Sequence, residues 1–340
     1  MSPVGVALVG YGYWGPNLAR NIAASRSARL VAVCDASAER RAQAEASYLG
    51  SAMCADLSEA LAMPEVEAVF IATPVFTHHA LATAALWAGR HVFVEKPIAG
   101  TAAEAWDLVA LASEVDRCLM VDHTFLYTGA VRKVRELVES GEIGKLQYFD
   151  SCRVSLGLIQ SDVNVLWDLA VHDLSILDFV VQRRPRWVSA VGTRHAISPQ
   201  VNTAFLTLGY DDDFIAHINV NWLSPVKIRR TLIGATSKMI VFDDLEPSEK
   251  VKVYDAGYDP AADGMPSSAV RRRVGDVWIP LLDGREALAA EVDAFAAYVR
   301  GGVAPHNDGR SGAGLVEILE AANASLAQGG CPTDLPEAHS

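Results

Sequence analysis

The sequence is short of cysteine and of basic residues, and each shortage excludes a class of protein. Its five cysteines among 340 residues are widely spaced and form no CxxC pair, which fits neither a disulfide framework nor a zinc site. We therefore expect buried thiols in a reducing compartment and no metal site. Lys and Arg number 29 against 41 Asp and Glu, a net charge of −12. Because nucleic-acid affinity depends on basic residues that neutralise phosphates, nucleic acid is a poor candidate partner.

A secretory signal and a clear membrane span are also missing. No basic residue precedes Arg20, so the charged start of a signal peptide is absent. Residues 68–89 carry no formal charge and are long enough to cross a bilayer. They contain Thr73-Pro74 and the pair His78-His79, and we interpret them as a buried strand, a turn and a helix. We expect a cytoplasmic, soluble protein with no membrane partner.

Apolar residues are plentiful, at 51% of the chain, which allows sizeable cores. Over residues 1–122, short β-branched runs alternate with Ala-rich stretches of helical spacing, a pattern typical of a parallel sheet flanked by helices. The runs are continuously apolar, which indicates a sheet covered on both faces. We predict a doubly wound α/β domain here. Its main strands are expected at residues 4–9, 30–34, 68–72, 91–94 and 118–121.

From residue 123 onward the pattern changes to strands with inward and outward alternation. Short turns such as Tyr210-Asp211-Asp212-Asp213 separate some of them, which favours an antiparallel sheet. We predict a second α/β domain over residues 123–330, whose last helices pack back on the first domain, and a frayed tail over 331–340. Strands are expected at residues 147–154, 187–193, 203–208, 215–222, 229–233, 239–242 and 251–254, and helices at 128–140, 167–181, 286–300 and 314–328.

A GxGxxG motif, Gly10 to Gly15, lies between the first predicted strand and helix. Such glycines permit a tight turn, close approach to a pyrophosphate and close packing of helix on strand, while the helix N-terminus offers free N–H groups to the anion. The alternative is a simple glycine-rich turn. Asp35 ends the second strand 20 residues after Gly15, where a carboxylate can accept hydrogen bonds from both ribose hydroxyls of an adenosine. The combination favours dinucleotide binding.

The residues after the second strand bear on the choice of coenzyme. Asp35 should repel a 2′-phosphate, so we expect NAD rather than NADP. Ser37, Arg40 and Arg41 follow closely and could bind such a phosphate, which keeps NADP open. Tyr13 and Trp14 are expected against the nicotinamide half of the coenzyme or in simple packing.

Two further motifs carry candidate catalytic groups. Glu95-Lys96-Pro97 follows the predicted strand at 91–94, at the sheet edge where open α/β sheets bind ligands, and a lysine there can hydrogen-bond a substrate hydroxyl. Asp168 and His172 are spaced i, i+4, which places them on one face of a helix, and a histidine is the natural group to exchange a hydroxyl proton. The alternatives are a surface Glu/Lys pair and an Asp that caps a helix above a packed histidine.

These motifs, with Ala72-Thr73-Pro74 and His91 to Pro97, resemble the Gfo/Idh/MocA oxidoreductase family over roughly residues 4–328. The resemblance implies a Rossmann domain followed by an α/β domain with an open, mainly antiparallel sheet, assembled as a homodimer or homotetramer. It implies hydride transfer between a nicotinamide and a sugar or cyclitol carbon, with Lys96 as the catalytic lysine, His172 as acid/base and Asp168 as an orienting or substrate-binding carboxylate. The residues expected to bind the coenzyme are Gly10, Gly12, Tyr13, Trp14, Gly15, Asp35, Ser37, Arg40, Thr73, Pro74, His78, Glu95 and Lys96.

Residues 162–173 are similar to the branch of the family that acts on nucleotide-linked or glycosidic amino sugars, often at C3 of the hexose. Tyr127 and Arg153 are candidate substrate contacts beside Asp168 and His172, although Arg153 could instead be a solvated strand end. Asp122 stands where the family commonly has Gly or Asn, and with the acidic charge it suggests a cationic amino-glycoside. The alternatives are an NADPH-dependent 3-ketosugar reductase and a non-catalytic dinucleotide-binding sensor.

Overall fold

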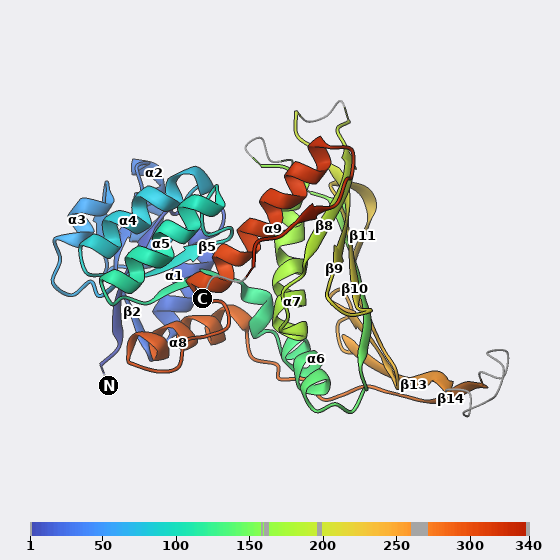
Figure 1. Cartoon of the computed structure of the whole chain (residues 1–340). Helices are drawn as coiled ribbons and strands as arrows, with labels where there is room; N and C mark the ends of the chain where they lie inside the picture. Colours follow the sequence, from blue (N-terminus) through green and yellow to red (C-terminus); the bar gives the residue numbers. More distant parts are fainter. Residues whose placement is uncertain (1, 158, 160–162, 196–198, 260–270, 338–340) are drawn as a thin grey trace. The chain divides into compact units, whose positions relative to one another are not determined.

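The protein is described by a computed structural model that covers residues 2–337 except 158, 160–162, 196–198 and 260–270 (Figure 1). The chain forms two compact units. The first contains residues 1–127 and 285–317, and the second contains residues 128–284 and 318–340. Within the described part of the chain, no helix has both the length and the apolar character needed to cross a membrane.

The first unit is built on a six-stranded sheet of order β3-β2-β1-β4-β5-β6, in which all neighbouring strands are parallel. Every residue of β1 and β4 is buried, because helices cover both faces of the sheet as predicted. The strand order reverses between β1 and β4, the point at which such sheets bind ligands. The strands are β1 (Val4–Val9), β2 (Ala28–Cys34), β3 (Ala52–Cys54), β4 (Ala68–Ile71), β5 (His91–Glu95) and β6 (Leu119–Asp122).

Helices with clear sequence signals surround this sheet. Ser37, Asp56 and Thr101 each cap a helix by accepting a backbone N–H of its first turn. Phe295 of the late helix α8 lies edge-on to Phe70 at 5.1 Å between ring centroids, and so joins the core of this unit. The helices are α1 (Gly15–Ala24), α2 (Ala38–Ser47), α3 (Leu57–Leu61), α4 (His78–Trp87), α5 (Ala102–Glu114), α8 (Ala287–Val299) and the start of α9 (Gly309–Ala327).

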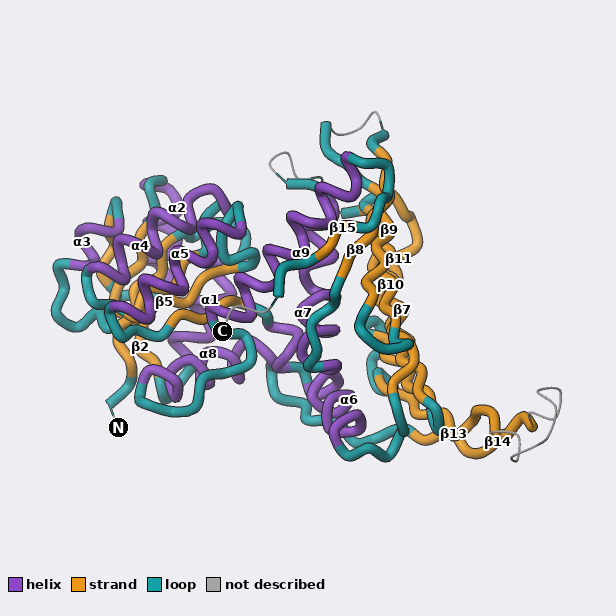
Figure 2. Tube along the Cα trace, viewed as in Figure 1, coloured by secondary structure: helices purple, strands orange, loops and turns teal. Residues whose placement is uncertain are grey.

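The second unit is built on a nine-stranded sheet of order β14-β13-β12-β11-β7-β10-β9-β8-β15 (Figure 2). Only the described pair β7 and β10 is parallel, so the prediction of a mainly antiparallel sheet is confirmed. Burial alternates along β10, as expected for a sheet with one covered face. The strands are β7 (Leu146–Leu156), β8 (Trp187–Thr193), β9 (Thr203–Gly209), β10 (Ile215–Asn221), β11 (Leu223–Ala235), β12 (Met239–Asp243), β13 (Val251–Asp259), β14 (Arg271–Trp278) and β15 (Thr333–Asp334).

Helices α6 (Gly129–Glu139) and α7 (Val171–Val181) pack on the covered face of this sheet. The segment predicted as one helix over residues 167–181 begins instead with a π-helical turn, Leu166–Ala170, and α7 follows it directly. Asp168 therefore lies in a wider turn than the one that contains His172.

The end of the chain and three cysteines differ from expectation. The tail predicted as frayed contains β15, which pairs antiparallel with β8 because the edge of that sheet offers unpaired backbone groups. Cys331 is exposed, and Cys118 and Cys152 are partly exposed, so only Cys34 and Cys54 are the buried thiols that were expected. All five cysteines are free thiols that form no disulfide.

Candidate coenzyme and substrate site

The glycine motif forms the turn that a dinucleotide requires. Gly10 has φ of +97°, and a Cβ at this position would meet the backbone of Ala72. A Cβ on Gly15 would collide with the carbonyl oxygen of Gly10, which explains why only glycine fits where α1 packs on β1. A Cβ on Gly12 would meet only the flexible end of Arg40 at 3.6 Å, so no backbone obstructs this part of the turn. The helix α1 has no side-chain cap, so the positive end of its dipole is open to an anion, although Asn17 already donates its N–H to the carbonyl oxygen of Trp14 at 2.9 Å.

Asp35 organises the loop that would hold the adenosine ribose. One carboxylate oxygen accepts the backbone N–H of Tyr11 at 2.8 Å, and the other accepts that of Ser37 at 2.8 Å. The guanidinium of Arg40 lies 3.7 Å from the carboxylate, and about half of its side chain is exposed. Arg41 turns away and donates to the carbonyl oxygen of Asp35. Each carboxylate oxygen retains a lone pair for a ribose hydroxyl.

His78 ties together two segments at the same sheet edge. It is 1% exposed, with Nδ1 2.9 Å from the carbonyl oxygen of Pro97 and Nε2 2.8 Å from that of Thr73. Burial lowers its pKa, so a neutral ring donates to only one of the two carbonyls. Its position fits packing better than contact with a coenzyme, since the ring is enclosed.

Lys96 follows β5 at the edge that carries the glycine loop, and its peptide bond to Pro97 is cis. The side chain of Glu95 points back to the chain, where it accepts the backbone N–H of Lys96 at 2.9 Å. Glu95 also pairs in register with Asp122 of the neighbouring strand β6. The Glu95 carboxyl interacts with that of Asp122 as well as with Lys96, so Glu95 is more than one half of a surface Glu/Lys pair.

The two aromatic residues of the loop behave differently. Tyr13 is 84% exposed, whereas the indole of Trp14 donates to Asp122 at 2.9 Å. Asp122 is 3% exposed, so its carboxylate lies beneath the loop rather than on an open surface. Tyr127 is also buried, and its hydroxyl donates to Asn307 at 2.8 Å.

In the second unit, Asp168 and His172 lie at the start of the helical segment that packs on the sheet. The indole of Trp222, which is almost fully buried, donates to the Asp168 carboxylate at 2.9 Å and fixes its direction. His172 is followed by Asp173, which forms a buried ion pair with Arg153 at 2.7 Å. Arg153 is 4% exposed, so the alternative of a solvated strand end is wrong, and its partner Asp173 explains why a cation is tolerated there.

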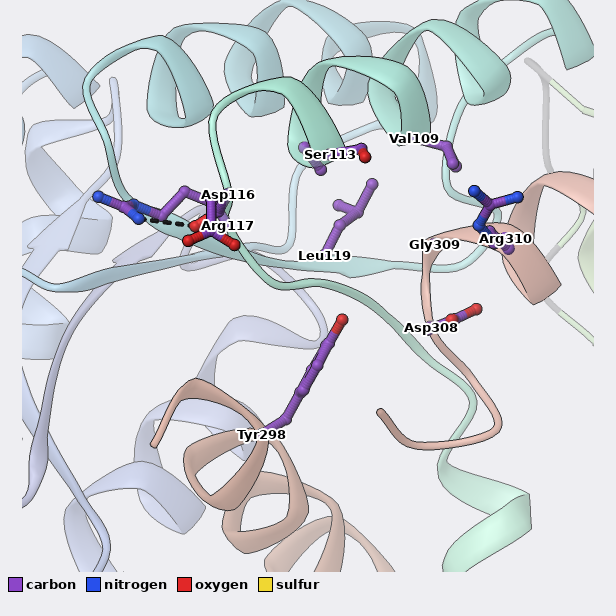
Figure 3. A pocket seen from close by; sticks show the side chains of 10 residues that line it. Val109, Ser113, Asp116, Arg117, Leu119, Tyr298, Asp308, Gly309 and Arg310 are labelled. Carbon is purple, nitrogen blue, oxygen red and sulfur yellow. Dashed lines mark hydrogen bonds between the residues drawn. The ribbon is translucent and has the colours of Figure 1, made fainter. Parts of the chain in front are cut away.

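A separate cavity of about 250 Å³ lies in the first unit, lined by Ser113, Leu119, Tyr298 and Arg310 among others (Figure 3). Leu119 begins β6, whereas the glycine loop follows the end of β1. Since the strands are parallel, this cavity is at the opposite edge of the sheet from the glycine loop. No residue predicted for the site lines it.

Two family models match most of the chain. A model described as "Oxidoreductase family, NAD-binding Rossmann fold" matches residues 4–123, and one described as "GFO/IDH/MocA C-terminal domain" matches residues 131–240. The protein is a nicotinamide-dinucleotide-dependent oxidoreductase. It belongs to the Gfo/Idh/MocA family, as the resemblance in its motifs predicts.

Several relatives cover most of the chain. UDP-N-acetylglucosamine 3-dehydrogenase of Acidithiobacillus ferrooxidans is 28% identical over 85% of this chain and 86% of its own length. The solved structure of that enzyme, GnnA, gives a TM-score of 0.81 at 25% identity over 97% of this chain and 99% of its own. The WlbA dehydrogenase from Bordetella pertussis, solved with NADH and UDP-GlcNAcA, gives a TM-score of 0.80 at 22% identity over 98% and 99%. GenD2 from gentamicin A biosynthesis, solved with NAD, gives 0.83 at 22% over 99% and 97%. At 22% identity, the last two support the fold alone.

Proposed function

We propose that the protein is an NAD-dependent sugar dehydrogenase that moves a hydride between C3 of a hexose and the nicotinamide, with a nucleotide sugar or an amino-glycoside as substrate. The observation that carries the proposal is the position of Lys96, directly after β5 at the sheet edge that holds the glycine loop and Asp35. A lysine there lies where an open α/β sheet presents groups to a bound ligand.

The coenzyme fits the residues of the first unit. The unobstructed turn at Gly12 and the uncapped start of α1 would take the pyrophosphate, and Asp35 would take the ribose hydroxyls. The bound nicotinamide supplies the hydride acceptor. The carboxylate of Asp35 favours NAD over NADP, since a 2′-phosphate there would face a negative charge.

In the oxidative direction, the substrate must lose a proton from its hydroxyl and a hydride from the same carbon. His172 accepts the hydroxyl proton, and Lys96 hydrogen-bonds the oxygen while the C–H bond breaks and the carbonyl forms. Asp168, held by Trp222, orients the sugar beside His172. The convergence of Lys96 and His172 on one alcohol is part of this proposal.

The nature of the substrate rests on the relative from Acidithiobacillus ferrooxidans, which is named as a 3-dehydrogenase of UDP-N-acetylglucosamine. That name supports a nucleotide-linked hexose. Asp122, the residue that suggests a cationic sugar, is buried and accepts the indole N–H of Trp14, so we propose the amino-glycoside as the second of the two substrates.

The test uses purified protein and a set of UDP-hexoses, free glycosides, aminoglycosides and inositols, with absorbance of reduced nicotinamide as the readout. We expect reduction of NAD⁺ with a UDP-hexose. Deuterium at C3 of that hexose should slow the reaction and appear in the reduced coenzyme. Label retained in the sugar would exclude C3, and the absence of reduction with every compound would contradict the proposal.

A second candidate, an NADPH-dependent 3-ketosugar reductase, is favoured by Arg40. Its half-exposed guanidinium beside Asp35 could pair with a 2′-phosphate. Binding of NADH and of NADPH, measured by fluorescence of the reduced ring, separates the two candidates. If the second candidate is right, Arg40→Ala should weaken the binding of NADPH and not that of NADH. If the first is right, the affinities of the variant for both coenzymes should be close to those of the wild type.

A further inference from the structure

Three carboxyl groups meet in the first unit beside the glycine loop. Glu95 and Asp122 are register partners at the ends of the parallel strands β5 and β6. Glu291 comes from α8, and its side chain lies within hydrogen-bonding reach of Asp122. Asp122 and Glu291 are 3% and 0% exposed. The residues that the structure describes contain no group of three acidic, His or Cys side chains placed to hold a metal ion.

Hydrogen bonds connect this carboxyl cluster, Glu95, Asp122 and Glu291, to the loop. The Oδ2 atom of Asp122 accepts the indole N–H of Trp14 at 2.9 Å, while Oδ1 accepts the backbone and hydroxyl of Thr124. Asp122 is thus the link between the cluster and the turn that contains Gly12 and Gly15.

The bonding of Glu291 is incomplete unless it carries a proton. Its Oε1 accepts the backbone N–H of His123 and the side-chain amide of Asn307, each at 2.9 Å. Its Oε2 is buried and has no hydrogen-bond partner among the described residues. An ionised carboxylate in this position would be a buried charge beside the carboxyl groups of Asp122 and Glu95. A neutral acid would instead donate its O–H to Asp122, which is the acceptor within reach.

We propose that Glu291 is a protonated carboxylic acid and a positioning residue for the coenzyme, because its hydrogen bond to Asp122 holds that side chain on Trp14 of the glycine loop. Coenzyme binding then favours the protonated cluster. The inference rests on the proposed dinucleotide site and does not depend on the substrate.

The charges around the cluster agree with this assignment. Burial is the largest effect that raises the pKa of Glu291 well above its usual value, and the neighbouring Asp122 and Glu95 add to it. Burial likewise raises the pKa of Glu95, against a smaller lowering by Lys96. Among the groups that face the cluster are Lys96, which lowers the pKa of Glu95, and the backbone N–H of the buried His123.

The raised pKa sets the direction of the pH dependence. Glu291 holds its proton at pH values where an ordinary Glu, with a pKa of 4.5, has lost it. A rise in pH through the raised pKa removes this proton. The carboxylates of Asp122 and Glu291 then carry two negative charges that repel each other. Affinity for the coenzyme should therefore be highest at pH values below the raised pKa of Glu291 and should fall as the pH rises through it.

The experiment measures NAD⁺ binding to the full-length protein by titration calorimetry between about pH 6 and pH 9, which lies above the range in which an ordinary carboxyl group titrates. Buffers of different ionisation enthalpy report the protons exchanged. We expect proton uptake on binding at the upper end, with a Kd that rises by up to about tenfold per pH unit, as one linked proton requires. Glu291→Gln keeps a donor for Asp122 without a titrating group, and should bind NAD⁺ as the wild type does near pH 6 with no proton uptake at higher pH.

The matched control is Glu317→Gln, since Glu317 is a carboxyl group of the same unit that accepts an indole N–H from Trp106 at 2.7 Å, as Asp122 does from Trp14. It should keep the pH profile of the wild type. A wild-type Kd that is flat with pH, or a Glu291→Gln profile equal to that of the wild type, would overturn the inference and leave the proposed function standing. Failure of the wild type to bind any nicotinamide dinucleotide would overturn both. Should Glu291→Gln fail to fold, proton uptake by the wild type alone decides the matter.

Discussion

Replacement of Arg153 by methionine should destabilise the second unit strongly. Arg153 donates to Asp173 through Nε at 2.7 Å and through a second nitrogen at 3.3 Å, and the two side chains are only 5% and 2% exposed. Methionine fills much of the same volume but removes the cation, so the buried carboxylate keeps only the hydroxyl of Ser151 from the contacts described. Loss of one partner from a buried ion pair typically costs about 3–5 kcal/mol of unfolding free energy.

Urea unfolding followed by tryptophan fluorescence measures this loss. With a denaturant slope of at most about 3 kcal/mol per molar urea, the midpoint should fall by about 1 M or more. The control is Arg186→Met, because Arg186 pairs with Asp211 at a similar distance, 2.8 Å, but the side chains are 67% and 75% exposed. That variant should leave the midpoint unchanged, since water already solvates both charges.

The double variant Arg153→Met/Asp173→Leu distinguishes two causes of instability, the unpaired charge of Asp173 and altered packing around residue 153. Removal of both charges should recover part of the stability that Arg153→Met loses, because no buried charge is then left unpaired. Equal shifts for Arg153→Met and Arg186→Met would refute the reasoning, and so would a double variant that loses the sum of both single effects.

Three further predictions concern activity and assembly. Lys96→Ala and His172→Ala should each lower turnover by about 10²- to 10⁴-fold while NAD⁺ still binds, as expected for acid–base groups, and normal turnover in both would contradict their roles. Trp222→Phe removes the donor to Asp168 and should lower kcat/KM in a steady-state assay by about tenfold to a hundredfold. The control Trp278→Phe, on β14, should leave kcat/KM unchanged in the same assay. Light scattering should give a homodimer or homotetramer that Phe205→Glu disrupts, because Phe205 is 41% exposed on the sheet; a monomeric wild type would exclude this.

Much of the fold could be predicted because local and global signals agree. In the first unit, the continuously apolar runs place the five predicted strands within two residues of those observed. The strand β14 could not be predicted, because its sequence from Arg271 to Trp278 is largely basic and polar and lacks the alternation of a half-buried strand. The π-helical turn before α7 was likewise hidden, since its sequence has ordinary helical spacing.

The candidate site was predictable where a short motif carries the chemistry. The glycine turn, Asp35 and Lys96 lie at one sheet edge because strand ends set their positions. The partners of these residues could not be found in the same way. Glu291 is 169 residues beyond Asp122 in the sequence and lies in an ordinary amphipathic helix, and Trp222 lies between β10 and β11, 54 residues beyond Asp168. Only tertiary packing brings such side chains together.

The two hydrogen bonds that Asp35 accepts from Tyr11 and Ser37 constrain any redesign of coenzyme preference. A variant meant to bind NADP would replace this carboxylate by a small neutral side chain. The backbone N–H groups of Tyr11 and Ser37 would then lose the acceptor that holds the loop. Such a variant would lose affinity for both NAD and NADP, because the loop that binds them would no longer be held in place. Engineers would first have to supply substitute acceptors for those amides, and only then recruit Arg40 to the phosphate.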